Sequence, residues 1–237
     1  MSVGAGVDKP IGVSPRATRP TVSPMSSMSP TLTVPRAESL REHAVRYTDE
    51  RRWDVLPGAW LETSHGRVAC SCAVPGCRAP GAHPTRPDWT AQATGSVAAA
   101  RRLWTEEPRA AILLPTGRSF DVLEVSETAG CLALARMERL GGTLGPVTQT
   151  PFGRMQFFVA PGSAPKVPAL LRKLGWAAMA TELTVRGEGD FVAAPPTRVG
   201  ARGSVQWVRP PSSANRWLPD VEDLLAPLAY ACGQEPR

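Results

Sequence analysis

Residues 110–159, AAILLPTGRSFDVLEVSETAGCLALARMERLGGTLGPVTQTPFGRMQFFV, decide the fold class of this 237-residue chain. Continuous or alternating apolar runs predict strands at residues 110–114, 120–125, 146–150 and 155–159. Between the second and third strands, apolar residues at helical spacing predict a helix over 128–140, which Gly141-Gly142 ends. The last two strands form a predicted hairpin around Phe152-Gly153. The segment therefore predicts a sheet with a helix packed against it.

The flanking sequence adds further elements on both sides. Ser39 and Glu42 have the spacing of a capping box, so a helix is predicted to begin just after Ser39. Residues 53–61 form a predicted extended segment, broken at Pro57-Gly58. Further helices are predicted at residues 97–104, 167–174 and 220–231, and further strands at residues 183–186, 191–194 and 205–208. The full pattern predicts an α+β domain, residues 37–237, with a mixed sheet flanked by helices.

The first 36 residues differ in composition from the rest of the chain. They are rich in Pro, Ser and Thr and have few large apolar side chains, so nothing there offsets the entropy cost of ordering, and we expect a disordered tail. A functional basic arm is the alternative. The tail carries Lys9, Arg16, Arg19 and Arg36 against Asp8, which is half of the net charge of +6. The remaining domain is therefore only weakly basic, and its charge alone does not indicate a nucleic-acid partner.

Hydropathy limits where the protein can act. The apolar runs are far shorter than the about 20 residues of a transmembrane helix, and no apolar stretch follows the first basic residues as in a signal peptide. We therefore expect no membrane association and a cytoplasmic location. The five cysteines are an odd number in a chain without a secretion signal, which argues against a disulfide framework.

Three cysteines and a histidine are clustered in one short loop, residues 70–83. Cys70, Cys72, Cys77 and His83 have the spacing C-x-C-x4-C-x5-H, and two Pro-Gly turns fold the chain back between them. Zinc prefers four tetrahedral thiolate and imidazole ligands, and four protein ligands leave no open position for catalysis. The loop therefore predicts a structural zinc site. An incidental cysteine cluster is the alternative, and His65 is an alternative ligand to His83.

Several segments, in this order, resemble the N-terminal domain of bifunctional DNA primase/polymerases, within the archaeo-eukaryotic primase superfamily. The resemblance covers about residues 40–210 and rests on order and spacing. The segments are 80–84 (PGAHP), Trp89 to Thr94, 114–118 (LPTGR), 120–124 (FDVLE), 146–150 (PVTQT) and 189–197 (GDFVAAPPT). The resemblance implies DNA-directed nucleotidyl transfer with Mg²⁺ or Mn²⁺, held by an acidic D-x-D pair and a third acid. It also implies a nucleotide-gripping histidine in an S-G-G-x-H-like turn.

This sequence departs from that pattern at each position. The acidic pair maps to Glu124 and Ser126, the histidine to Met155 in the segment 151–155, and the third acid to Thr184. Ser and Thr hydroxyls are neutral, and one carboxylate cannot hold two Mg²⁺ ions. We therefore expect a catalytically impaired domain.

Nearby acids provide an alternative. Glu127 lies just beyond the strand and could join Glu124 in a rearranged metal site, which would make the protein an active nucleotidyltransferase that uses Mg²⁺ or Mn²⁺. Asp121 is predicted to face away from Glu124, because strand residues three apart point to opposite faces.

The expected partners follow from these alternatives. An impaired domain that still binds DNA or a nucleotide would use Arg118, Arg154 and Arg186, with Trp207 or Trp217 available for base stacking. Each tryptophan could instead be a packing residue. A third hypothesis is a zinc-stabilised module that binds a protein partner and no nucleic acid.

Overall fold

The computed structural model describes residues 38–64, 66–176 and 183–234. The predicted tail over residues 1–36 and the alternative ligand His65 lie outside the described residues. Described helices are α1 (Leu40–Arg51), α2 (Val97–Glu106), α3 (Glu127–Arg139), α4 (Val167–Lys173) and α5 (Val221–Gly233), with 3-10 turns at Trp89–Ala91, Ala164–Lys166, Gly200–Arg202 and Ser213–Asn215. None of the described helices is long and apolar enough to cross a membrane.

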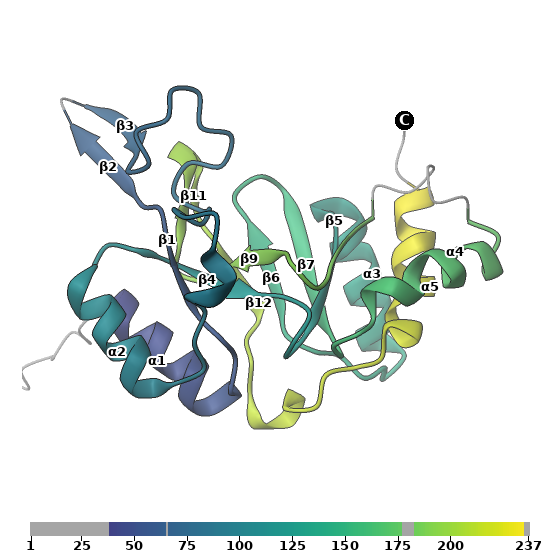
Figure 1. Cartoon of the computed structure of the whole chain (residues 1–237). Coiled ribbons are helices and arrows are strands. Elements are labelled where there is room, and N and C mark those ends of the chain that lie inside the picture. The colour runs from purple at the N-terminus through teal and green to yellow at the C-terminus, as the bar shows by residue number, and fades with distance from the viewer. Residues whose placement is uncertain (1–37, 65, 177–182, 235–237) are drawn as a thin grey trace, which may run out of the picture. The chain divides into compact units, whose positions relative to one another are not determined.

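The main sheet has five strands in the order β12-β6-β7-β5-β8. Their bounds are β5 (Asp121–Ser126), β6 (Val147–Thr150), β7 (Arg154–Val159), β8 (Thr184–Arg186) and β12 (Gln206–Arg209). A three-stranded sheet has the order β1-β4-β9, from β1 (Leu56–Gly58), β4 (Ala111–Pro115) and β9 (Phe191–Ala193). Two strand pairs complete the fold: β2 (Leu61–Ser64) with β3 (Arg67–Cys70), and β10 (Arg198–Val199) with β11 (Gly203–Ser204). Figure 1 shows this arrangement.

The α+β fold class is confirmed, with one correction. All strand pairs among the described residues are antiparallel, where the sequence predicted a mixed sheet. A second correction concerns Pro57-Gly58, which lies inside β1 rather than breaking it. Strand β1 is at the edge of its sheet, where proline is tolerated because no second neighbour needs its missing N–H group.

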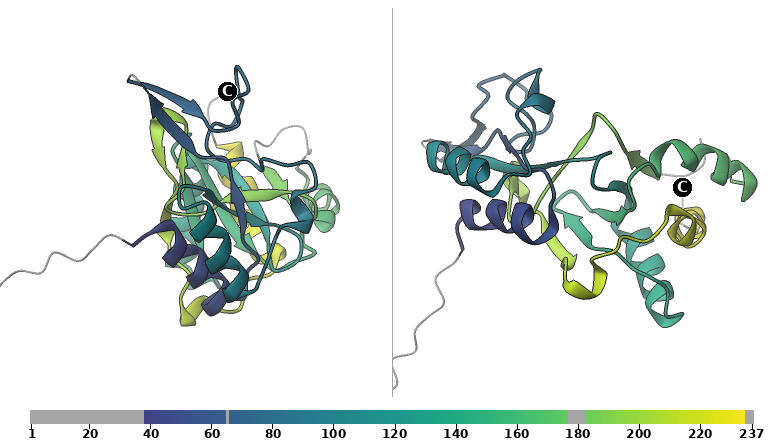
Figure 2. Two further views of the ribbon diagram at one scale, coloured as in Figure 1. Left: turned by 60° about the vertical axis from the view of Figure 1, so that its left-hand side comes forward. Right: turned by 60° about the horizontal axis from the view of Figure 1, so that its bottom comes forward.

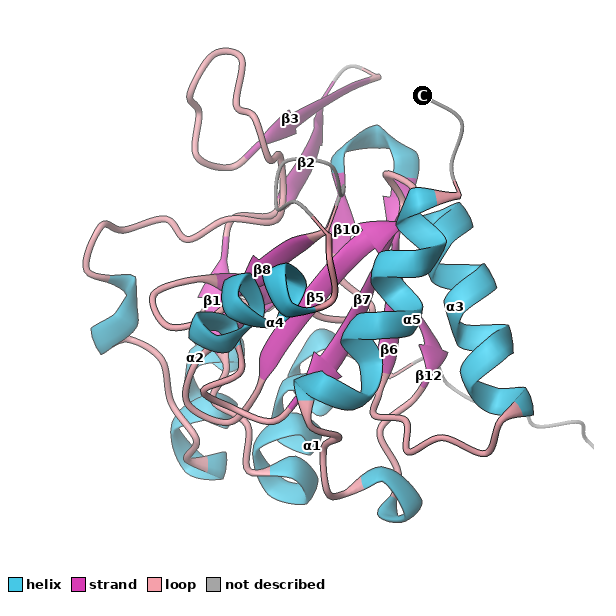
Figure 3. Cartoon of the chain, turned by 90° about the vertical axis from the view of Figure 1, so that its right-hand side faces the viewer, coloured by secondary structure: helices cyan, strands magenta, loops and turns pink. Residues whose placement is uncertain are grey.

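The two faces of the main sheet belong to two hydrophobic cores. On one face, the cross-strand neighbours Leu123–Phe157 and Val125–Met155 of β5 and β7 pack under α3, α4 and α5 (Figure 3). On the other face, Val122 and Phe158 pack with residues from α1 and α2, which lie side by side on the far side of the sheet from α3 (Figure 2). Apolar burial on both faces fixes the sheet between two helical layers.

Local signals determine several element ends as predicted. The capping box at the start of α1 is present, with the Ser39 hydroxyl accepting from the Glu42 N–H and the Glu42 carboxylate accepting from the Ser39 N–H. The β6–β7 hairpin turns at Gly153, whose φ of 69° is a conformation that favours glycine. This hairpin and β5 carry the side chains of the site described next.

Candidate functional site

The four predicted metal ligands converge. The ligand atoms of Cys70, Cys72, Cys77 and His83 all lie within 4.8 Å of one another. In a tetrahedral zinc site with Zn–S bonds of about 2.3 Å and Zn–N bonds of about 2.0 Å, neighbouring ligand atoms are about 3.5–3.8 Å apart. Cys70 Sγ and His83 Nε2 are 3.3 Å apart. This donor set fits a metal ion such as zinc.

Backbone hydrogen bonds orient the possible metal ligands and favour their metal-binding forms. The Nδ1 atom of His83 is 2.7 Å from the Pro84 carbonyl oxygen, which fixes that nitrogen as the N–H donor and leaves Nε2 to face the cysteines. The Gly81 N–H group donates to Cys70 Sγ at 3.4 Å. A hydrogen bond from the Val74 backbone lowers the pKa of Cys72, which favours the thiolate that binds metal. The strand pair β2–β3 leads the chain into this loop at Cys70.

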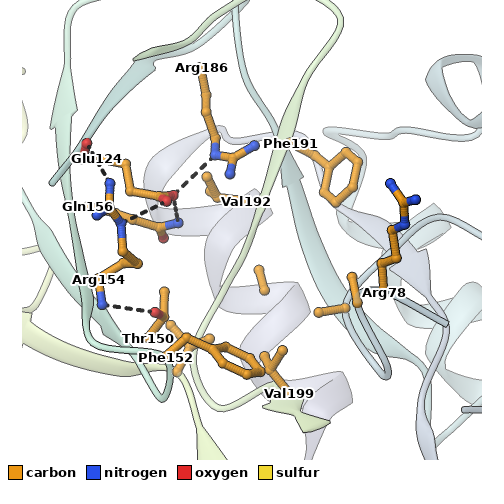
Figure 4. Close-up of a pocket in the computed structure, with 14 residues that line it drawn as sticks. Arg78, Glu124, Thr150, Phe152, Arg154, Gln156, Arg186, Phe191, Val192 and Val199 are labelled. Atoms are coloured by element: carbon orange, nitrogen blue, oxygen red, sulfur yellow. Dashed lines mark hydrogen bonds and ion pairs between the residues drawn. The ribbon is translucent and has the colours of Figure 1, made fainter. Parts of the chain in front are cut away.

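A pocket of about 350 Å³ lies beside the main sheet. Its walls come from β5, the β6–β7 hairpin, β8, β9, the β10–β11 region and the metal loop. Its lining residues are Arg78, Ala79, Ala82, Glu124, Thr150, Phe152, Arg154, Gln156, Arg186, Phe191, Val192, Ala193, Val199 and Val205 (Figure 4). The lining thus combines three arginines and one carboxylate with an apolar wall.

Glu124 is the carboxylate of this pocket, and its oxygens accept three hydrogen bonds from side chains. Oε2 accepts from Gln156 Nε2 at 2.8 Å and from Arg186 Nε at 3.2 Å, and Oε1 accepts from Arg154 Nε at 3.4 Å. Burial alone would raise the pKa of Glu124. The Gln156 hydrogen bond and the two guanidinium groups outweigh burial and hold the pKa below its ordinary value. Glu124 is therefore a charged carboxylate whose oxygens already accept hydrogen bonds from protein side chains.

Arg186 has a second acidic partner. Its Nη1 atom lies 3.1 Å from the nearer Asp190 carboxylate oxygen, while its Nε atom contacts Glu124. Burial would lower the pKa of Arg186, but Glu124 and Asp190 together raise it. The Arg186 guanidinium, at the last residue of β8, lies between two carboxylates that fix its orientation.

Met155, the position matched to the family's histidine, does not line the pocket. Met155 pairs with Val125, is fully buried and packs in the core under α3. Gln156, one residue later, pairs with Glu124 and lines the pocket. Successive residues of a strand face opposite sides, so a shift of one residue along β7 exchanges the two. Sequence reasoning missed Gln156, because it placed the residue equivalent to the family's histidine one position earlier on the strand.

Four other residues were considered for the metal site and lie outside the pocket lining. They are the positions matched to the family's acids, Ser126 and Thr184, and the nearby acids Asp121 and Glu127. Thr184 is the cross-strand neighbour of Glu124 on β8 and is exposed. The Ser126 hydroxyl accepts from the Ala129 N–H at 3.1 Å and caps α3. Asp121 is buried on the opposite face, where Oδ2 accepts from the Ala164 N–H at 2.7 Å, as alternation predicted. Glu127 Oε1 accepts from Gln149 Nε2 at 2.7 Å, and Gln149 pairs with Met155 on the face away from Glu124.

The predicted nucleic-acid contacts divide in the same way. Arg154 and Arg186 line the pocket, whereas Arg118 is elsewhere and pairs with Asp54 at 2.7 Å. Trp207 packs against Phe158, with its indole N–H donating to the Tyr47 hydroxyl at 3.2 Å, so its ring is a packing residue. Trp217 is 86% exposed.

Sequence comparison agrees with this architecture. A family model described as the N-terminal domain of bifunctional DNA primase/polymerase matches residues 44–217, which contain the metal loop, the main sheet and every residue of the pocket. No curated protein and no solved structure matches the chain. The chain therefore belongs to the family of bifunctional DNA primase/polymerase N-terminal domains.

Proposed function

We propose that this domain binds nucleic acid or a nucleotide in the Glu124 pocket and that its nucleotidyl transfer is impaired. One observation carries the proposal. Glu124 is the single carboxylate among the described residues that line the pocket, and three side chains already donate hydrogen bonds to its oxygens.

The charge of the lining favours a phosphate ligand. Arg78, Arg154 and Arg186 oppose Glu124 alone, so the walls carry a net positive charge. Guanidinium groups bind phosphate through paired, charge-assisted hydrogen bonds. The aromatic rings of Phe152 and Phe191 provide apolar surface on which a base can stack. Together these groups match the two halves of a nucleotide.

The same donor set does not fit a pair of catalytic divalent cations. Mg²⁺ binds carboxylate and other oxygen ligands, and two-metal transfer needs several carboxylates that converge. Here Ser126 and Thr184 are neutral and lie outside the pocket lining, and Glu127 is held by Gln149 on the other face. These placements favour impaired transfer over a rearranged site built from Glu124 and Glu127.

Binding is tested by fluorescence polarisation with fluorescein-labelled oligo-dT and with dTTP as competitor. Arg154→Ala and Arg186→Ala should each weaken binding about tenfold, because each removes a charge-assisted hydrogen bond. The matched control is Arg102→Ala, an exposed residue of α2 that pairs with Glu106. Affinity should also fall steeply with salt, since phosphate contacts release counterions. Absence of binding by the wild-type protein would favour the protein-interaction hypothesis.

Impaired transfer is tested by primer extension with Mg²⁺ or Mn²⁺. We expect no template-directed synthesis, because charge stabilisation of the triphosphate is the main contribution to this reaction. Synthesis that disappears in a Glu124→Ala control would instead support the active nucleotidyltransferase with a rearranged site.

A further inference from the structure

One wall of the pocket is built from the metal loop. Arg78, Ala79 and Ala82 line the pocket, and they lie in the segment 78–82, whose two ends are joined to the ligands Cys77 and His83. A metal ion at the cluster would therefore fix both ends of this wall.

The wall also packs closely against the β10 strand. The Gly200 N–H group donates to the Pro80 carbonyl at 2.9 Å, and Ala82 is buried with Val199 and Val205. Gly81 has a φ of +76°, and a Cβ atom there would lie 2.9 Å from the Arg198 carbonyl oxygen. The short distance leaves little freedom for the backbone beside Arg78 as long as the loop keeps its shape.

Arg78 is placed differently from the other two arginines of the pocket. Arg154 and Arg186 both contact Glu124, whereas Arg78 lies across the pocket from them (Figure 4) and is exposed. Among the described residues, no carboxylate is within ion-pair distance of Arg78. Its guanidinium is thus available for a phosphate group without displacing an internal partner.

We propose that Arg78 contacts the phosphate of the bound ligand and that the Cys₃His metal site holds it in place, so that metal loading and phosphate binding are linked. The proposal rests on phosphate binding in the Glu124 pocket, as inferred above. Linkage is reciprocal: if metal raises the affinity for phosphate, phosphate raises the affinity for metal by the same factor. The phosphate belongs to a nucleoside triphosphate or to a nucleic-acid backbone, and both are tested.

The first measurement compares affinities of the zinc-loaded full chain for labelled oligo-dT and for dTTP. Arg78→Ala should weaken binding about tenfold, the effect of one charge-assisted hydrogen bond. Arg86→Ala is the matched control, because Arg86 is an exposed arginine just beyond His83 that pairs with Asp88 and does not line the pocket. A loss with dTTP identifies a nucleotide phosphate, and a loss with oligo-dT alone identifies a nucleic-acid backbone.

The second measurement is the affinity for zinc, from equilibrium competition with a chromogenic chelator. Saturation with oligo-dT or dTTP, whichever binds, should raise the zinc affinity about tenfold in the wild type and in Arg86→Ala, but not in Arg78→Ala. Removal of zinc from the wild type should weaken phosphate binding to the Arg78→Ala level, and zinc should restore it.

Three results would overturn the proposal. Affinity of Arg78→Ala within twofold of the wild type, while Arg154→Ala and Arg186→Ala lose binding, would remove Arg78 and leave the proposed function standing. A zinc affinity that bound ligand does not change would remove the linkage. A wild-type protein that binds neither oligo-dT nor dTTP would contradict the proposed function itself.

Discussion

At the scale of single residues, the pocket depends on the charge of Glu124. Glu124 is 8% exposed, and its carboxylate connects β7 and β8 through Gln156, Arg154 and Arg186. A buried charge with good partners contributes little net stability, but removal of one member leaves the others unpaired. The residue therefore matters more for the arrangement of the two guanidinium groups than for the total free energy of folding.

Glu124→Gln should lower the free energy of unfolding by about 2 kcal/mol at pH 7, because it removes the anion that the partly buried guanidinium groups of Arg154 and Arg186 share. Its pKa lies below the ordinary value of 4.5, so this stabilisation is present above pH 4.5 and is lost as the pH falls through the lowered pKa. Urea unfolding of both proteins between pH 7 and pH 3 measures the difference. Glu127→Gln, which neutralises an exposed carboxylate that accepts from Gln149, is the control; an equal loss in both variants would contradict the prediction.

At the scale of elements, the metal loop (residues 70–83) has too few buried apolar side chains to keep one conformation by packing alone. Residues 73–76 and Arg78 are exposed, and the buried residues Gly81 and Ala82 are small. Such a segment needs a cross-link to keep one conformation, and four converging ligands provide it if a metal binds.

Purified protein should contain one zinc per chain, since the four ligand atoms converge and four protein ligands can complete a tetrahedral zinc shell. Cys72→Ser should abolish stoichiometric zinc and lower the melting temperature, because metal binding contributes directly to folding. Elemental analysis and thermal unfolding measure both. Cys131→Ser, an exposed cysteine outside the loop, is the control. Wild-type protein that contains no stoichiometric metal before chelation would refute the site.

Helix α3 approaches β7 closely at Gly130. A Cβ atom at this position would lie 2.6 Å from Met155 Sδ and 2.7 Å from Met155 Cβ, so the contact requires glycine. The approach fixes α3, and with it the cap at Ser126, against the sheet.

Gly130→Ala should destabilise the protein by about 1–3 kcal/mol, although alanine is favoured over glycine in a helix by about 1 kcal/mol. The control, Thr128→Ala, makes an exposed alanine in the same helix and should be neutral or stabilising. Chemical unfolding of the two variants measures the difference. A stability gain in Gly130→Ala would show that Met155 can move aside.

At the scale of the whole molecule, the main sheet separates two environments. One face is closed by α3, α4 and α5. The other face is covered by α1 and α2 around Val122 and Phe158 and is open to the pocket at Glu124 and Gln156. Neighbouring positions of β7 therefore differ in their surroundings, since Met155 lies in an apolar core and Gln156 among polar side chains. The two positions should respond oppositely to the same substitution.

Met155→His should lower the melting temperature strongly, because it buries an imidazole without partners in an apolar core. Gln156→His should be tolerated, since it lies among polar side chains at the pocket. Thermal unfolding compares the two. The variant set Ser126→Asp, Gln156→His and Thr184→Asp is accordingly the set to test for recovered primer extension. Equal stability of the two histidine variants would contradict the assignment of faces.

Features that depend on local pattern can be predicted from the sequence. The α+β class, the capped start of α1, the hairpin turn at Gly153 and the four ligands of the metal loop follow from periodicity, turn residues and spacing.

The set of side chains that meet in the pocket depends on tertiary packing. Strand β7 is buried on both faces except at its first residue, so its sequence lacks the alternation that would separate Met155 from Gln156. Arg78 reaches the pocket through contacts between the metal loop and the β10 region, more than 100 residues later in the chain. Local patterns carry no signal for such contacts, because they arise only when the sheets and the metal loop pack together.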